Sequence, residues 1–215
     1  MSSGFILGVD LDGVCGDYTT AFREVVAEDY GVDPDTLPAD RSWDFSEWGI
    51  TSPQEFDRLH RLAVLDQRMF RTMPPLPGVA DSLWRLSDAG VWIRIITHRL
   101  CVNWGHAVAV ADTVAWLDDT GIPYRDICFL GAKPEVDAHC YVDDASHNVL
   151  ELRAAGNHVI VFDAPYNQGI DGPRATSWTD VEQLVTDRIA EVGVPLQPQL
   201  PGVDPGSDRL TRRVK

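Results

Sequence analysis

Chemically reactive side chains follow four apolar segments of the chain, at or just beyond the point where each is predicted to end as a strand. Two acids, Asp10 and Asp12, follow the first segment. A hydroxyl, an amine and a second pair of acids follow the later ones: Thr97, Lys133, Asp143 and Asp144. In an open parallel sheet the carboxyl ends of the strands meet at one edge, where ligands bind. The sequence therefore predicts that these side chains share one site.

The chemistry that suits this set of groups is phosphoryl transfer. Four carboxylates at one edge would repel one another unless a cation compensates their charge, and hard oxygen ligands favour Mg²⁺. Neither His nor Cys is concentrated at these positions, which argues against zinc. Asp10 could then attack phosphorus, while Asp12 could protonate the leaving oxygen and later activate water. Lys133 and the Thr97 hydroxyl would hold the phosphoryl oxygens.

The elements that must position these groups alternate between strands and helices. Near-continuous apolar runs predict buried strands at residues 5–10, 91–96, 126–130, 138–142 and 158–162. Apolar spacing and capping residues predict helices at 17–30, 53–69, 79–89, 104–119, 145–155 and 179–192. Residues 32–52 are predicted to be a loop. The alternation predicts an α/β fold with a Rossmann-like parallel sheet that helices cover on both faces.

Length, charge and cysteine usage narrow the class of protein. The chain has 215 residues, enough for one core with a small insert but not for two large domains. A net charge of −15 disfavours binding to a nucleic acid polymer, but not to a small phosphate monoester beside a metal ion. No run approaches the ~20 apolar residues of a membrane span, and the N-terminus lacks a signal peptide pattern. With four cysteines and no C-x-x-C pair, we expect reduced thiols and a cytoplasmic location without membrane contact.

The reactive groups resemble, in order and spacing, the motifs of the haloacid dehalogenase (HAD) superfamily. Asp10-Leu-Asp12-Gly-Val resembles motif I, Thr97 motif II, Lys133 motif III, and Tyr141-Val-Asp143-Asp144 motif IV. The second acid of motif I marks the phosphatase branch rather than the dehalogenase branch. The resemblance implies an aspartyl-phosphate on Asp10. It also implies Mg²⁺ held by the Asp10 side chain, the Asp12 carbonyl and Asp143, with Asp144 helping directly or through water.

A closer resemblance is to the 5′(3′)-deoxyribonucleotidases within that superfamily. It rests on residues 10–18, on the Pro-Leu-Pro-Gly sequence at 75–78, and on the ten-residue step from Lys133 to Asp143. It implies a small helical cap inserted between motifs I and II, and hydrolysis of nucleoside 5′-monophosphates, deoxy forms included. The expected division is a catalytic core of residues 1–16 and 76–194, a cap of residues 17–75, and a disordered tail of residues 195–215.

The resemblance also implies an aromatic pocket for the nucleoside. An aromatic residue at the position of Tyr18 would stack on the base, and other aromatic residues of the cap could form the walls: Trp43, Phe45, Trp48 and Phe70. Where the human members carry Ser after the Thr of motif II, this chain has His98 and Arg99. Arg99 could contact phosphate or the outer face of the substrate, so the specificity can differ.

Several alternatives stay open at this point. Tyr18 and the loop aromatics could be core residues, and Asp144 could be the N-cap of the helix that follows it. The enzyme could act on a sugar phosphate or another small phosphate. A catalytically silent binding module with the same fold is a further alternative, although such modules often lose the nucleophile or the second acid. Whether two copies form a homodimer is also left open.

Overall fold

A parallel β-sheet lies at the centre of the computed structural model, which describes residues 4–100 and 104–196. The strands are β1 (Ile6–Val9), β2 (Trp92–Thr97), β3 (Asp126–Phe129), β4 (Cys140–Asp143), β5 (Val159–Phe162) and β6 (Arg174–Ala175). Their order is β3-β2-β1-β4-β5-β6, with every neighbouring pair parallel. The predicted α/β fold is confirmed. The sequence analysis missed β6, because two residues are too short to leave an apolar pattern.

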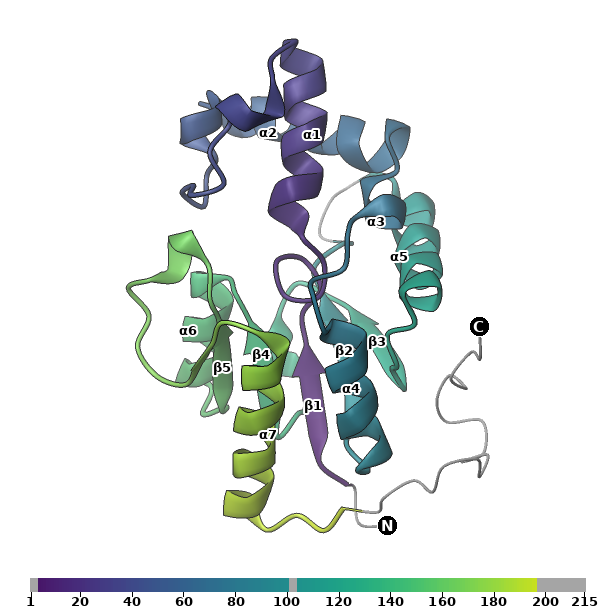
Figure 1. Ribbon diagram of the computed structural model, residues 1–215, viewed down its shortest axis with the longest axis vertical. Helices are drawn as coiled ribbons and strands as arrows, with labels where there is room; N and C mark the ends of the chain where they lie inside the picture. The colour runs from purple at the N-terminus through teal and green to yellow at the C-terminus, as the bar shows by residue number, and fades with distance from the viewer. Residues whose placement is uncertain (1–3, 101–103, 197–215) are drawn as a thin grey trace.

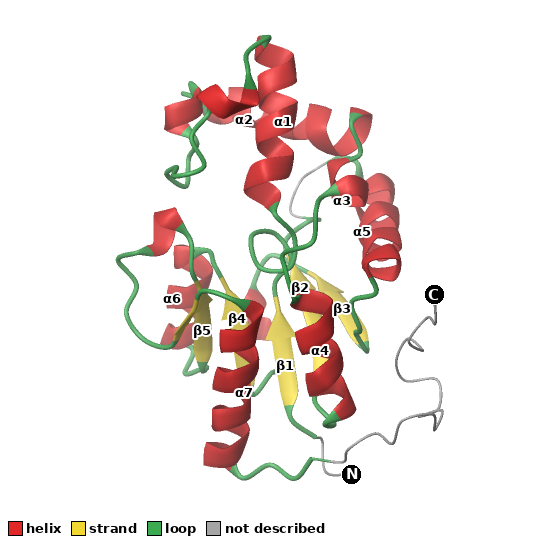
Figure 2. Ribbon diagram, viewed as in Figure 1, coloured by secondary structure: helices red, strands yellow, loops and turns green. Residues whose placement is uncertain are grey.

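Helices cover the sheet and extend beyond its carboxyl edge. They are α1 (Tyr18–Tyr30), α2 (Pro53–Arg61), α3 (Met69–Thr72), α4 (Val79–Asp88), α5 (His106–Thr120), α6 (Ser146–Ala154) and α7 (Trp178–Val192). The strand arrows in Figure 2 point toward α1 and α2, which lie away from the sheet. No helix of the described ranges is both long and apolar enough to cross a membrane.

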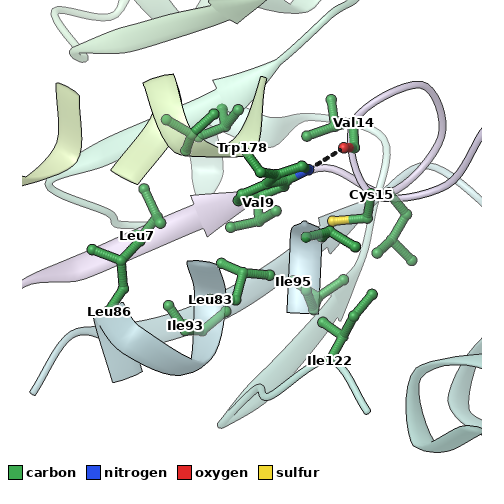
Figure 3. Close-up of a cluster of buried hydrophobic side chains, with 14 of the residues drawn as sticks. Leu7, Val9, Val14, Cys15, Leu83, Leu86, Ile93, Ile95, Ile122 and Trp178 are labelled. Carbon is green, nitrogen blue, oxygen red and sulfur yellow. Dashed lines mark hydrogen bonds between the residues drawn. The ribbon is translucent and has the colours of Figure 1, made fainter. Parts of the chain in front are cut away.

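Side chains of successive strand residues point to opposite faces of the sheet, and both faces are buried. Leu7 and Val9 pack with α4 and α7, as the close-up in Figure 3 shows, whereas Ile96 and Tyr141 belong to the cluster that includes α6. Gly8 lies between these last two side chains. A Cβ at Gly8 would lie only 2.7 Å from Cδ1 of Ile96 and 2.9 Å from Cδ1 of Tyr141, so a larger residue would have to displace these side chains. Burial on both faces explains why the strands were visible as near-continuous apolar runs.

The predicted helix over residues 53–69 is only partly correct. It begins as expected, because the Ser52 hydroxyl accepts a hydrogen bond from the Glu55 amide and Pro53 is the first helical residue. After Arg61 the chain continues as a π-helix (Leu62–Asp66), and at Arg68 the backbone turns left-handed before α3 begins. Ala63 and Val64 of this π-helix are buried. The predicted loop over 32–52 contains two short 3₁₀-helices, Pro34–Thr36 and Ser46–Trp48.

The segment that we call the cap, residues 17–75, has a hydrophobic cluster of its own. Phe22, Phe45 and Phe70 lie in this cluster, apart from the cluster between the sheet, α4 and α7. Ala109 of α5 joins the cap cluster, and Arg68 makes a two-point ion pair with Asp112 of α5 at 2.5 and 2.7 Å. These clusters support the division into core and cap, which stays a prediction. Residues 197–215, most of the predicted tail, lie outside the described residues.

Two chain segments connect the cap to the core, and they run side by side (Figure 1). The Leu76 amide donates to the Cys15 carbonyl at 2.7 Å, and the Asp17 amide donates to the Pro74 carbonyl at 2.8 Å. The Trp178 indole donates to the carbonyl of Val14 at 2.9 Å, a bond drawn in Figure 3. These bonds fix the end of motif I relative to the sheet. The thiols of Cys15 and Cys140 are buried and unpaired, and Cys128 is half-buried and unpaired.

Candidate active site

Three buried carboxylates converge where β1 and β4 end side by side. Oxygen atoms of Asp10, Asp143 and Asp144 lie within 4.8 Å of one another. The two strands pair with Val9 opposite Val142, so the acids that follow emerge at the same level of the sheet. The chain order changes direction between these strands, and open α/β sheets bind ligands at this position. The predicted convergence of motifs I and IV is therefore present in the structure.

The amine of Lys133 joins two of these acids. Its Nζ lies 2.8 Å from Oδ1 of Asp10 and 2.6 Å from Oδ2 of Asp143, and the side chain is 3% exposed. Lys133 begins a 3₁₀-helix, Lys133–Glu135, in the connection that follows β3. Burial alone would lower the pKa of Lys133, but the two carboxylates outweigh burial and raise it, so the amine stays charged.

The acidic cluster carries more negative charge than one lysine can balance. Burial raises the pKa of Asp10 to about 7, against the opposing effect of Lys133. Burial also raises the pKa of Asp144 well above its usual value, and the charges of Asp10 and Asp143 raise it further. A hard divalent cation would relieve this excess, and a donor set of carboxylate oxygens suits such an ion. The cluster is typical of a HAD metal site.

Hydrogen bonds fix the two acids of motif IV in different ways. Oδ1 of Asp143 accepts from the Ala145 amide at 3.0 Å and from Nδ2 of Asn148 at 3.2 Å. Asp144 accepts a hydrogen bond from the hydroxyl of Tyr166. Helix α6 has Ala145 as its N-cap, with no side-chain cap. The alternative in which Asp144 caps this helix is therefore wrong, because its carboxylate turns toward Tyr166 instead.

The end of β2 delivers Thr97, His98 and Arg99. Thr97 is fully buried, and its hydroxyl has no hydrogen-bond partner among the residues that the structure describes. Buried hydroxyls are usually satisfied, so this group is free to bond a ligand. His98 is half-buried, and burial lowers its pKa. The guanidinium of Arg99 contacts Asp12, with Nη2–Oδ1 at 2.6 Å and Nε–Oδ2 at 3.1 Å.

A cavity of about 780 Å³ opens above these groups, between the core and the cap. A volume of this size is typical of small-molecule sites. Its floor includes Asp10, Asp12 and Lys133, and aromatic side chains form much of its cap side: Tyr18, Trp43, Phe45, Phe56 and Phe70. The polar groups at one end and the aromatic rings at the other match a phosphate monoester with a flat apolar substituent.

The predicted aromatic residues have different positions in this cavity. Tyr18 lines it and also packs against both hydrophobic clusters, so it belongs to the wall and to the core at once. Trp43 is 52% exposed and contacts His147 and Tyr166 of the core edge-on, each with ring centroids 5.3 Å apart. Trp48 does not line the cavity: it is buried behind Phe45, so its predicted role as a wall is wrong.

Sequence analysis did not single out several residues that line the cavity, among them Arg41, His60 and Tyr166. Arg41 of the cap lies over the rings of Phe45 and Tyr166, with its guanidinium carbon 3.8 and 4.6 Å from their centroids. His60 of α2 stacks on Phe56, and burial lowers its pKa. Tyr166 lies in the connection after β5, at the same edge of the sheet as the motifs. The position of Tyr166 after a strand was a signal that could have found it, whereas the positions of Arg41 and His60 depend on the fold of the cap.

Comparison with known proteins decides the family. The family model described as "5′ nucleotidase, deoxy (Pyrimidine), cytosolic type C protein" matches residues 4–190. The chain belongs to this family. A relative from Chlorobaculum tepidum named "Putative 5′(3′)-deoxyribonucleotidase" is 45% identical over 183 residues, which cover 85% of this chain and 91% of that protein. This member of the 5′-nucleotidase family is therefore a phosphoric monoester hydrolase, as the sequence analysis predicted.

Solved structures show the wider fold relationship of this family member. A haloacid dehalogenase-like hydrolase from Streptococcus pneumoniae superposes with a TM-score of 0.59 at 14% identity, covering 86% of this chain and 100% of that one. A crystal structure of a predicted phosphatase from Clostridium acetobutylicum gives a TM-score of 0.61 at 12% identity, with the same coverage. At these identities the likeness concerns the fold alone, and it confirms the predicted HAD-like fold.

Proposed function

We propose that this enzyme hydrolyses nucleoside 5′-monophosphates, deoxy forms included, with Mg²⁺ as its metal and Asp10 as its nucleophile. The observation that carries the proposal is one cavity with two unlike ends. Asp10 and Lys133 lie at its floor, and aromatic rings of the cap face them. The family's name and that of the Chlorobaculum relative support the same substrate class.

The residues that would hold Mg²⁺ are the carboxylates of Asp10, Asp143 and Asp144, with the backbone carbonyl of Asp12. All four are oxygen donors, and the three carboxylate groups already approach one another in the fold. When bound, the ion would offset the charge of the acids and of the substrate phosphate, so that an anionic nucleophile can approach phosphorus. Tyr166 and Asn148 would keep two of the carboxylates in place through the hydrogen bonds described above.

In the first step a carboxylate oxygen of Asp10 forms a bond to phosphorus, and the bond between phosphorus and the 5′ oxygen breaks. Protonated Asp12 gives its proton to that oxygen, so the nucleoside leaves as a neutral alcohol. Lys133 and the unpartnered Thr97 hydroxyl donate to the phosphoryl oxygens as they take up charge. The products of this step are the nucleoside, an aspartyl-phosphate and the Asp12 carboxylate.

In the second step water attacks the aspartyl-phosphate. Asp12, now a carboxylate, accepts a proton from the water as its oxygen bonds to phosphorus. The bond from phosphorus to Asp10 breaks, inorganic phosphate leaves, and Asp12 is protonated for the next turnover. The two acids of motif I thus return to their starting states, and the net reaction consumes one water molecule.

The nucleoside would occupy the aromatic end of the cavity. Tyr18 is proposed to stack on the base, with Phe45 and Trp43 as further walls. Base–aromatic stacking tolerates different bases, so the wall by itself favours nucleotides without selecting one. A sugar phosphate would leave these apolar rings without a matching surface, which is why we rank that substrate second. The substrate contacts of His98 and Arg99 stay predictions.

Phosphate release from a panel of monophosphates tests the proposal. The panel holds ribo- and deoxyribonucleoside 5′-monophosphates, nucleoside 3′-monophosphates and sugar phosphates, each assayed with Mg²⁺ and with EDTA. We expect 5′-nucleotides to be turned over most efficiently, only with metal. Faster turnover of a sugar phosphate would contradict the proposed nucleotide substrate. Activity in EDTA would contradict the proposed requirement for Mg²⁺.

The cytosolic description of the family supports our further proposal of a cytoplasmic location.

A readout without catalysis complements this assay. Added Mg²⁺ should raise the thermal unfolding temperature of the wild type, because a ligand that binds only the folded state stabilises it. Asp143→Asn should abolish most of this rise. The variant Asp163→Asn, which removes a carboxylate that pairs with Arg174 outside the cluster, should keep it.

A further inference from the structure

Asp12, the proposed proton donor, makes a two-point ion pair with a single arginine, Arg99. Both of its carboxylate oxygens accept hydrogen bonds from Arg99, from Nη2 at 2.6 Å and from Nε at 3.1 Å. Two parallel bonds of this kind fix the plane of a carboxylate as well as its position. Lys133 does not share in this contact, since its partners are Asp10 and Asp143.

Arg99 is itself held rigidly. Its side chain is 1% exposed. Its third nitrogen, Nη1, donates to the Thr113 hydroxyl at 2.9 Å, and that hydroxyl donates to the Ala109 carbonyl within α5 at 2.7 Å. The guanidinium carbon lies 4.1 Å from the centre of the Phe70 ring in the cap. The arginine is thus anchored by the core helix on one side and by the cap on the other.

We propose that Arg99 is the positioning residue for Asp12: it orients the carboxylate so that the acid reaches the leaving oxygen of the substrate. This inference rests on the proposed function, in which Asp12 is the proton donor. Each carboxylate oxygen has two lone pairs, so the arginine leaves one on each oxygen for the transferred proton. This role of Arg99 differs from binding of the substrate phosphate. All three of its guanidinium nitrogens already donate hydrogen bonds to Asp12 or Thr113.

A comparison of leaving groups separates these two roles. A nucleoside leaves as a strongly basic alkoxide unless it receives a proton, whereas p-nitrophenolate is stable without one. A residue that acts through the proton donor should therefore matter for the nucleotide and matter little for p-nitrophenyl phosphate. A residue that binds the phosphoryl group should matter equally for both.

The experiment measures the first step alone, as single-turnover release of nucleoside or nitrophenol with enzyme in excess. For Arg99→Met we expect cleavage of the nucleoside 5′-monophosphate to slow about 100-fold, since proton transfer typically contributes 10²–10⁴-fold. Cleavage of p-nitrophenyl phosphate should change by less than about threefold. Arg99→Lys should recover part of the nucleotide rate, because an ammonium supplies charge without the two-point contact.

Two further variants test whether a loss of rate comes from the proposed role of Arg99 or from a general folding defect. Thr113→Val removes the anchor of Arg99 while keeping the volume of the core, and should give the same selective loss to a smaller extent. Arg94→Met breaks a matched two-point pair with Asp126, whose bonds measure 2.7 and 2.9 Å, and should leave the ratio of the two rates unchanged. Near-ultraviolet circular dichroism of each variant reports whether the core is intact.

The outcomes distinguish this inference from the proposed function. Equal losses on both substrates, or no loss on either in folded variants, would overturn the role of Arg99. A wild type that cleaves p-nitrophenyl phosphate but no nucleotide would overturn the proposed substrate. In that case an alkyl phosphate that the wild type does cleave replaces the nucleotide in the same comparison. A wild type that cleaves no phosphate monoester would overturn both.

Discussion

The ammonium group of Lys133 lies 2.8 Å from Oδ1 of Asp10, inside the protein and at the floor of the cavity. Apart from Lys215, it is the only lysine of the chain. An ion pair in this place favours the carboxylate form of the nucleophile against the effect of burial. It also leaves the amine beside the position where phosphoryl oxygens would bind.

Replacement of Lys133 by Met should therefore affect both catalysis and stability. We expect kcat to fall about 100- to 1,000-fold, the usual effect of losing one preorganised donor to a developing charge. In metal-free buffer at pH 8 the variant should unfold at a lower temperature than the wild type, because the Lys133 ammonium no longer balances the charges of Asp10 and Asp143. Phosphate release and thermal unfolding in EDTA measure the two effects. An unchanged kcat would remove Lys133 from the mechanism.

Asp10→Asn should abolish turnover and leave the fold intact. It should also change how stability depends on pH in metal-free buffer. Burial raises the pKa of Asp10 from 3.8 to about 7, so between these values the folded state binds more protons than the unfolded state. Stability that comes from this group is therefore present at low pH and is lost as pH rises toward 7.

Urea unfolding at pH 5, 6 and 7.5 in EDTA measures that difference. The free energy of unfolding of the wild type should fall more steeply with pH than that of Asp10→Asn. The charge of Asp10 is one cause of the raised pKa of Asp144, so Asp10→Asn also reduces the contribution of Asp144, which flattens the curve of the variant further. Parallel curves for the two proteins would contradict the raised pKa, and turnover by the variant would exclude Asp10 as the nucleophile.

The catalytic floor could be predicted from the sequence, and so could part of the aromatic wall, since four of the predicted aromatic residues line the cavity: Tyr18, Trp43, Phe45 and Phe70. Asp10, Lys133 and Asp143 were predictable together because parallel strands must end at one edge, and each follows such a strand. The ion pair between Arg99 and Asp12 could not be predicted, because it depends on how the residues after β2 turn back toward motif I. His60 carried no signal either: it points into the cavity only because α2 packs where it does.

Tyr18→Ala should weaken nucleotide binding selectively. Loss of a stacking platform costs about 1–3 kcal/mol for a base, which corresponds to a rise in KM of roughly 5- to 150-fold. For p-nitrophenyl phosphate, whose single ring is smaller, the rise should be several-fold less. Tyr18→Phe keeps the ring and is the matched control, expected to resemble the wild type. Equal effects on both substrates would show that Tyr18 acts as a core residue, in keeping with its contacts to both hydrophobic clusters.

His60 should make the protein less stable as the solution becomes acidic. Its ring stacks on Phe56 within the cap, and burial lowers its pKa below 6.5, against the opposing charges of Asp12 and Asp57. Below pH 6.5 the unfolded state therefore binds a proton that the folded state does not, so stability is lost as pH falls.

Replacement of His60 by Phe keeps an aromatic ring and removes this proton uptake. The free energy of unfolding, measured by urea titration between pH 7.5 and 5, should then fall less steeply than in the wild type, by at most about 1.4 kcal/mol per pH unit. Leu59→Met, a change in the cap cluster that removes no titratable group, is the control and should leave the slope as it is in the wild type. If His60→Phe also leaves the slope unchanged, the ring is protonated equally in both states, and the cap must admit water to it.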